Sequence, residues 1–91
     1  QTFKKGPDDI DPLWLGHAAR QPCFNLDFFT MSHEEIQTSF ASRSNNSSVS
    51  LIEGNKGLFD GLDVEGADSN AALAKLLSVP VILVIDSFGM T

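Results

Sequence analysis

The sequence predicts an α/β fold built on a parallel sheet, and three observations support this class. Strand-like and helix-like segments alternate along the 91 residues, which is typical of βαβ units. The most apolar run, Val79 to Ile85, is almost entirely Val, Ile and Leu, as in strands buried on both faces of a parallel sheet. The residues suited to chemistry follow the predicted strands, where open parallel sheets bind their ligands.

The first element is expected to be the end of a strand. It covers Gln1 to Lys5 and is terminated by Gly6-Pro7, because glycine and proline favour turns. A short helix is expected over residues 13–20, after Pro12, since proline is accepted in a first helical turn. Pro22 ends this helix.

The middle of the chain is expected to contain a second helix and a second strand. Ser32 followed three residues later by Glu35 forms a capping box. The helix is therefore expected to run from there to about Arg43. After a polar connector, Val49 to Glu53 is typical of a short strand.

The last third combines a long loop with a helix and the apolar strand. The loop, Gly54 to Ser69, holds four glycines and four acidic residues and has no periodicity. Long structureless loops in small domains are usually functional or disordered. A helix is predicted over Asn70 to Leu77, before the strand Val79 to Ile85.

Composition excludes several classes of protein. The net charge is −6, from 12 acidic and 6 basic side chains, which disfavours a nucleic-acid partner because such a partner requires a basic surface. No apolar run approaches the roughly 20 residues of a membrane span. The single cysteine, Cys23, cannot form an internal disulfide. A cytoplasmic enzyme of bacterial or archaeal type is therefore expected.

Lys4 to Asp11 is the first candidate site. Glycine allows the backbone to approach a ligand, and the charge of Lys4 suits a phosphate or carboxylate. Asp8, Asp9 and Asp11 repel one another unless a cation or hydrogen-bond donors compensate them. The alternative is a solvated acidic turn in which Asp11 caps the next helix.

Glu53 and the glycines after it form the second candidate site. An acidic residue at the end of a buried strand can hold Mg²⁺, which takes one or two carboxylates together with water and phosphate oxygens. The alternative is that Glu53 ends a strand and the glycines make turns. In the third candidate, Asn25-Leu26-Asp27 either orients a substrate or forms an Asx turn. Asp86 is either a ligand or the cap of a turn.

The remaining conspicuous side chains are expected to be structural. The aromatic residues are assigned to the core, His17 and His33 to structural or exposed positions, and Cys23 to a small buried hydrophobe. The aromatic group consists of Trp14, Phe24, Phe28 and Phe29. The chain contains no G-x-x-x-x-G-K-[ST] phosphate loop.

Three motifs and the last segment of the chain together resemble the cobyrinate a,c-diamide synthase family. Lys4 to Pro12 is similar to the family pattern Lys-x-Gly-Pro-Asp-Tyr-Ile-Asp-Pro, and Asn25 to Asp27 is similar to its Asn-Leu-Asp. Glu53 to Gly61 is similar to Glu-Gly-x-x-Gly-Leu-Tyr-Asp-Gly, and the last strand with Asp86, Gly89 and Met90 is similar to the segment that follows. The order and spacing of the motifs agree over almost all of the chain.

The resemblance implies an ATP- and glutamine-dependent ligase. ATP with Mg²⁺ would activate peripheral carboxylates of a tetrapyrrole as acyl phosphates, and ammonia from glutamine would give the amides. The resemblance implies Glu53 as the metal ligand, and Lys4 and Gly54 beside the nucleotide phosphates. It implies catalytic roles for Asp8, Asp11 and Asp60, and substrate binding by Lys4, Asp9, Asn25 and Asp27.

The same resemblance implies that residues 1–91 are an internal fragment of the amino-terminal ATP-binding domain. That domain has the P-loop, dethiobiotin synthetase-like fold. The first strand and phosphate loop would precede Gln1, and the glutaminase domain would follow Thr91. The fragment alone is expected to be inactive, and to form an oligomer or swapped dimer through uncovered sheet edges.

Asp9 departs from the family pattern, which usually has tyrosine there. This leaves the tetrapyrrole open between cobyrinate and relatives such as sirohaem or nickel-sirohydrochlorin. A non-catalytic α/β module that docks a basic protein surface is the alternative from another class.

Overall fold

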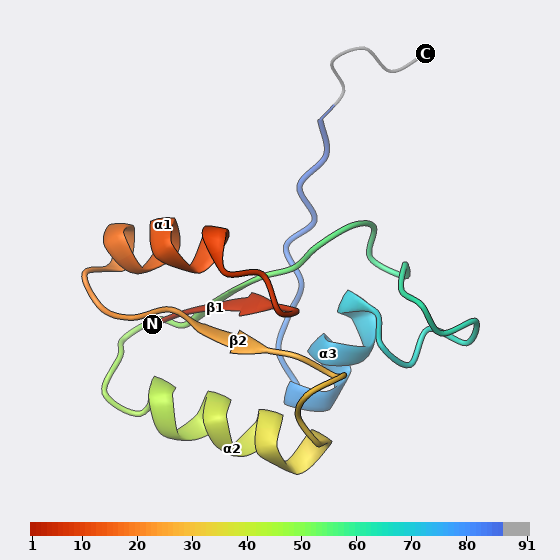
Figure 1. The fold of residues 1–91 in the computed structure, drawn as a ribbon, viewed down its shortest axis with the longest axis horizontal. Coiled ribbons are helices and arrows are strands. Elements are labelled where there is room, and N and C mark those ends of the chain that lie inside the picture. Colours follow the sequence, from red (N-terminus) through yellow and green to blue (C-terminus); the bar gives the residue numbers. More distant parts are fainter. Residues whose placement is uncertain (87–91) are drawn as a thin grey trace.

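The computed structural model describes residues 1–86 and centres on a three-stranded parallel sheet with the order β2-β1-β3. Helix α1 lies on one face of this sheet and α2 on the other, while α3 packs beside α2 (Figure 1). The strands are β1 (Thr2–Lys5), β2 (Phe24–Leu26) and β3 (Leu51–Glu53), and the helices are α1 (Ile10–Ala19), α2 (His33–Ser44) and α3 (Asn70–Leu77).

The core lies between the sheet and the pair α2 and α3. Phe3 in the central strand is fully buried, together with Leu26, Ile36 and Leu73 from the surrounding elements. The Phe40 ring packs against the Phe3 ring at a centroid distance of 5.1 Å. Burial of these side chains fixes which face of each element points inward, and it leaves the carboxyl ends of the strands accessible.

Several sequence-based predictions are confirmed. Both the strand at the start of the chain and the helix Asn70–Leu77 are present. The capping box is complete, because Ser32 Oγ accepts from the Glu35 amide and the Glu35 carboxylate accepts from the Ser32 amide. The strand after the polar connector is shorter than expected and starts at Leu51.

Helix α1 begins three residues earlier than predicted, and Asp11 does not cap it. The structure places Asp9 at the N-cap without a side-chain cap hydrogen bond. The Asp8 carboxylate instead accepts a hydrogen bond of 2.8 Å from the Ile10 amide. Pro12 is accommodated in the first turn because its missing N–H would have no partner there.

Strand β2 was not anticipated, since no strand was predicted between the first two helices. It pairs in parallel with β1, placing Phe24 opposite Phe3 and Leu26 opposite Lys5. The Arg43 guanidinium of α2 stacks on the Phe24 ring at 3.4 Å. So short a strand exists through these tertiary contacts, and local sequence does not reveal it.

The aromatic residues are only partly in the core. Phe24 and Phe28 pack against it, as expected, but the prediction is wrong for the other two. Trp14 is 71% exposed on α1 and Phe29 is 67% exposed after β2. The sheet and α2 offer no buried surface at these two positions.

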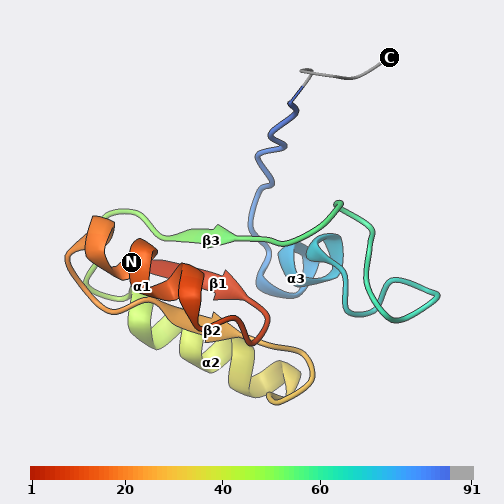
Figure 2. The same ribbon diagram turned by 45° about the horizontal axis from the view of Figure 1, so that its top comes forward.

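The predicted strand Val79 to Ile85 is not formed among residues 1–86. The segment runs beyond α3 without regular structure (Figure 2), and its side chains from Val81 onward are at least half exposed. It lines a groove together with β3 and α3. A strand requires a hydrogen-bonded neighbour, and within residues 1–86 this segment does not pair with β3 or with another strand.

No helix in residues 1–86 combines the length and the apolar character needed to cross a membrane.

The capping box predicts a measurable contribution to stability. Ser32→Ala is expected to lower the free energy of unfolding by about 1 kcal/mol, because the Glu35 amide loses the hydroxyl that accepts its hydrogen bond. Chemical denaturation followed by circular dichroism measures this change. Ser42→Ala on the exposed side of α2 is the matched control and is expected to be close to neutral; equal losses for both variants would contradict the capping role.

Candidate functional site

Lys4 lies at the centre of the candidate site and binds three oxygens. Its Nζ is 3.0 Å from Glu53 Oε1, 3.1 Å from Asp11 Oδ2 and 3.3 Å from the Gly54 carbonyl oxygen. The parallel register places Lys4 directly opposite Glu53. The three N–H donors of the ammonium group match these three acceptors, so Lys4 joins β1, α1 and the end of β3.

The charges in this cluster stabilise one another. Lys4 is buried, whereas the side chains of Asp11 and Glu53 remain 43% and 47% exposed. Burial alone would lower the pKa of Lys4, but hydrogen bonds and charges from Glu53 and Asp11 outweigh it and hold this pKa above its ordinary value. Lys4 therefore remains a cation throughout the neutral range, and both carboxylates keep one face open to solvent.

Asn25 holds the loop between β1 and α1. Its Nδ2 donates to the carbonyl oxygens of Gly6 and Asp8, at 2.7 and 2.9 Å. Gly6 has a φ of +91°, a conformation that favours glycine. The Gly6 amide donates to the Leu26 carbonyl. The loop is thus fastened to β2.

The three aspartates of this loop differ in their surroundings. Asp11 reaches Lys4 from the first turn of α1. Asp8 turns toward the backbone of that helix, and the hydrogen bond from the Ile10 amide holds the pKa of Asp8 below its ordinary value. Asp9 is exposed to solvent. Only one of the three therefore joins the Lys4 cluster directly.

Asn70 organises the start of the loop after β3. Its Oδ1 accepts from the Asn55 amide, and its Nδ2 donates to the carbonyl oxygens of Asn55 and Gly57. A Cβ atom at Gly54 would lie 2.8 Å from the Asn70 amide, so this position requires glycine for packing. The sequence-based expectation that Gly54 also lets a ligand approach the backbone stays a prediction.

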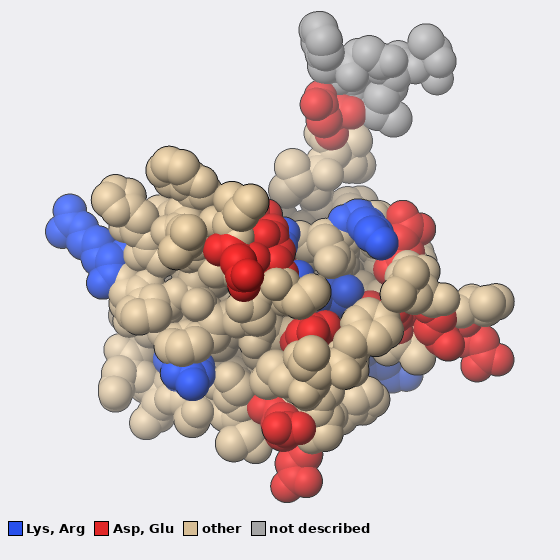
Figure 3. All heavy atoms as spheres, in the orientation of Figure 1, with Lys and Arg blue, Asp and Glu red and all other residues tan. Residues whose placement is uncertain are grey.

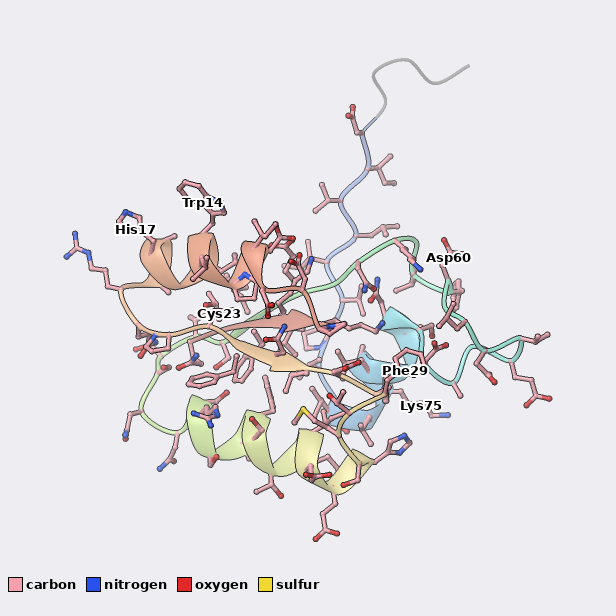
Figure 4. All side chains as sticks on the ribbon, in the orientation of Figure 1. Trp14, His17, Cys23, Phe29, Asp60 and Lys75 are labelled. Atoms are coloured by element: carbon pink, nitrogen blue, oxygen red, sulfur yellow. The ribbon has the colours of Figure 1, made fainter. Side chains whose placement is uncertain are left out.

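The rest of this loop is held by its own acidic side chains. Asp60 Oδ2 accepts from the Gly57 amide at 3.1 Å, while the Asp68 carboxylate accepts from the amides of Leu62 and Asp63. Asp60 lies on this loop, on the side of the molecule away from His17 and Trp14 of α1 (Figure 4). The hydrogen bond that Asp60 accepts thus lies within its own turn, and its catalytic role stays a prediction.

Asn25 and Asp27 of the Asn-Leu-Asp motif have different structural roles. Asn25 fastens the first loop, whereas Asp27 is buried in an Asx turn. Asp27 Oδ1 accepts from the Phe29 amide and its Oδ2 accepts from Thr30 Oγ1. This is the turn alternative weighed for the motif, and substrate binding by either residue stays a prediction.

Part of the last segment that resembles the family, with Asp86, Gly89 and Met90, lies outside the described residues. Asp86 is the last described position, while Gly89 and Met90 fall beyond it. Within residues 1–86, no three His, Cys, Asp or Glu side chains come together as a metal site. The donor chemistry nevertheless fits Mg²⁺ at Glu53, since this ion binds through one or two carboxylates and completes its shell with water and phosphate oxygens.

Two further residues support the site: Lys5 belonged to the first candidate site without a role of its own, and Asn70 was missed by sequence reasoning. Lys5 is buried on β1 and donates to Asn55 Oδ1 at 3.2 Å, and burial holds the pKa of Lys5 below its ordinary value. Asn70 was assigned only to a helix start. The sequence offered one signal for this arrangement. Asn55 lies between Gly54 and Gly57, and asparagine in such a turn often forms hydrogen bonds with neighbouring groups; in the structure it contacts both Lys5 and Asn70.

The role of Asn25 is testable by an isosteric change. Asn25→Asp replaces a donor by a carboxylate facing two carbonyl oxygens, and we expect a loss of about 1–3 kcal/mol in the free energy of unfolding. The loss should shrink at acidic pH, where the protonated carboxyl can donate again. Thermal unfolding between acidic and neutral pH measures it. Asn46→Asp adds the same charge at an exposed position, and an equal effect there would contradict the loop-fastening role.

Comparison with known proteins gives consistent similarities. The chain is 56% identical over 86 residues to the cobyrinate a,c-diamide synthase of Magnetococcus marinus, covering 94% of this chain and 18% of that protein. It is 42% identical over 91 residues to the synthase of Syntrophotalea carbinolica, and 38% identical over 92 residues to that of Methanococcus vannielii. These matches cover 99% and 100% of this chain, and 20% and 21% of the two relatives. No protein-family model matches the chain, and no solved structure matches it significantly.

The chain spans about a fifth of the length of these relatives. Within that fifth, the similarity is continuous and includes the loops that carry Lys4, Asn25 and Glu53. The chain is therefore homologous to one continuous segment of the cobyrinate a,c-diamide synthases.

Proposed function

We propose that this chain supplies part of the ATP-binding domain of a ligase that amidates peripheral carboxylates of cobyrinate. The observation that carries the proposal is the Lys4 cluster. It places Glu53 and Asp11 around one buried cation, at the carboxyl end of a parallel sheet, in a segment homologous to these synthases. Ligands of open parallel sheets bind at this end.

The proposed domain has the P-loop, dethiobiotin synthetase-like architecture. The described residues supply three parallel strands of such a sheet. In this proposal, further strands and the phosphate loop come from other parts of the polypeptide. The exposed edge of β3 and the apolar residues 81–85 support that expectation, because both have the character of surfaces that pair or pack. In isolation, the same surfaces would favour an oligomer or swapped dimer.

The proposed reaction has two steps. ATP supplies the phosphoryl group that converts a carboxylate into an acyl phosphate, and ammonia derived from glutamine displaces phosphate to give the amide. Because phosphoryl transfer depends on positioning and charge neutralisation, a half-exposed carboxylate beside a buried cation suits the site. In this proposal Glu53 holds Mg²⁺.

The surrounding residues would position the reactants. Lys4 Nζ contacts three protein oxygens, so we propose that Lys4 orients the carboxylates of Glu53 and Asp11. It could contact a phosphate only if one of these three oxygens were replaced by a phosphate oxygen. Asp8 and Asp11 would face the substrate end of the site. Asp9 stands where the family pattern that the sequence resembles has tyrosine, and it would border the substrate.

The relatives' names favour cobyrinate as the substrate over sirohaem and nickel-sirohydrochlorin. The three relatives compared above are all cobyrinate a,c-diamide synthases, from two bacteria and a methanogen. The proposal therefore commits to cobyrinate. A non-catalytic docking module remains the alternative from another class. If that alternative holds, loss of the Glu53 carboxylate should leave turnover nearly unchanged.

Glu53→Gln tests the ligase directly. We expect a loss of turnover on the order of 100-fold or more, because the amide keeps the size of the side chain but cannot supply the charge that binds the metal. The assay uses the Magnetococcus marinus synthase with its matching segment replaced by this chain. It measures the mass change of cobyrinate in the presence of ATP, Mg²⁺ and glutamine.

The matched control for this experiment is Glu65→Gln in the same chimera. Glu65 is an exposed carboxylate on the loop after β3, and its loss is expected to leave turnover unchanged. Turnover near wild type for Glu53→Gln would instead favour the docking module.

Asp60→Asn tests the predicted role of Asp60. Asparagine can still accept from the Gly57 amide and so preserves the turn. We expect amidation to fall by on the order of 100-fold, while hydrolysis of glutamine continues, since the proposed role concerns only the acyl-phosphate step. Loss of glutamine hydrolysis with carboxylate phosphorylation intact would contradict this role.

A further inference from the structure

The outer face of α1 is apolar and uncovered in the described structure. Ile10, Leu13 and Trp14 are 67%, 74% and 71% exposed, and their spacing places them on one face of the helix. Figure 4 shows Trp14 and His17 on the side of α1 that points away from the sheet. The helix packs on β1 with its other side, so this apolar face is additional to the core.

The two ends of this face differ in charge. The first turn of α1 carries Asp11, which is bound to Lys4, so the face begins at the candidate site. The other end carries the exposed C-cap residue Arg20 beside His17. In Figure 3, uncharged surface covers α1 between an acidic group near the site and basic atoms at the far end. The helix of ten residues spans about 15 Å between these ends.

We propose that this face of α1 is the platform on which the flat ring of the tetrapyrrole lies during amidation. The inference rests on the proposed function and adds the surface that selects the substrate. Trp14 and Leu13 would contact the apolar face of the macrocycle, and Arg20 would pair with a peripheral carboxylate. Another carboxylate of the same ring would then lie at the Lys4 end, where the reaction occurs.

Charge and position favour the macrocycle over a protein segment as the occupant. A tetrapyrrole with peripheral carboxylates combines apolar ring faces with an anionic rim. The face of α1 is apolar in its middle and cationic at Arg20, so the ring would cover the middle and one carboxylate of the rim would pair with Arg20; the acidic first turn lies beside Lys4. Because its first turn contributes Asp11 to the Lys4 cluster, whatever covers this face also borders the reacting carboxylate.

Binding can be measured on this chain itself, because Trp14 is its only tryptophan. Cobyrinate is expected to quench the Trp14 fluorescence with a saturable titration curve. The control is the double variant Trp14→Phe/Phe29→Trp, which moves the reporter to an equally exposed aromatic position beyond β2. Saturable quenching should be absent from the control. Absence of saturable quenching of Trp14 would overturn the platform.

The chimera described above tests the same face during catalysis. Trp14→Ala is expected to raise KM for cobyrinate about tenfold, the equivalent of about 1.4 kcal/mol of binding free energy. Arg20→Ala should also raise this KM, whereas kcat and KM for ATP stay unchanged. Phe29→Ala is the matched control and should alter none of these constants.

The outcomes separate this inference from the proposed function. If Glu53→Gln retains turnover while Trp14 is quenched saturably, the proposed role of Glu53 fails and the binding of cobyrinate on α1 stands. If Glu53→Gln abolishes turnover but Trp14→Ala leaves KM for cobyrinate unchanged, the platform is wrong. A lower melting temperature of the Trp14→Ala chimera with unchanged KM would assign the face to another segment of the polypeptide, which also overturns the inference.

Discussion

Lys4 joins three segments that are distant in the sequence, and the candidate site depends on this one buried cation. Its ammonium group contacts Asp11 from α1, Glu53 from β3 and the Gly54 carbonyl oxygen within 3.3 Å. Without that positive charge, two carboxylates would face each other at the end of the sheet and repel. The parallel register of β1 and β3 is what places Lys4 and Glu53 side by side.

Around this cluster, amides and glycines hold the loops in place. Asn25 fastens the loop after β1, and Asn70 fastens the loop after β3. Each amide bridges backbone groups that would otherwise require water. Gly6 adopts a left-handed conformation, while Gly54 leaves room for Asn70. The site is consequently preorganised by neutral side chains that the motifs themselves do not identify as functional.

Two surfaces of the described chain are apolar without being part of the core. The outer face of α1 borders the Lys4 cluster, which connects it to the substrate end of the proposed site. Residues 81–85 have the composition of a buried strand and yet remain largely exposed. Composition alone does not bury this segment, because a strand must pair its backbone with a neighbour, and within residues 1–86 the segment is paired with no strand.

Local sequence signals were sufficient where the determining interaction is local. The capping box at Ser32, the helix Asn70–Leu77 and the first strand followed from neighbouring residues, and the motif spacing correctly indicated the relationship to the synthases. Tertiary structure alone decided that Phe24–Leu26 forms a strand, that Trp14 is exposed and that Lys4 binds both Asp11 and Glu53. These outcomes depend on contacts between distant segments, and no local preference encodes them.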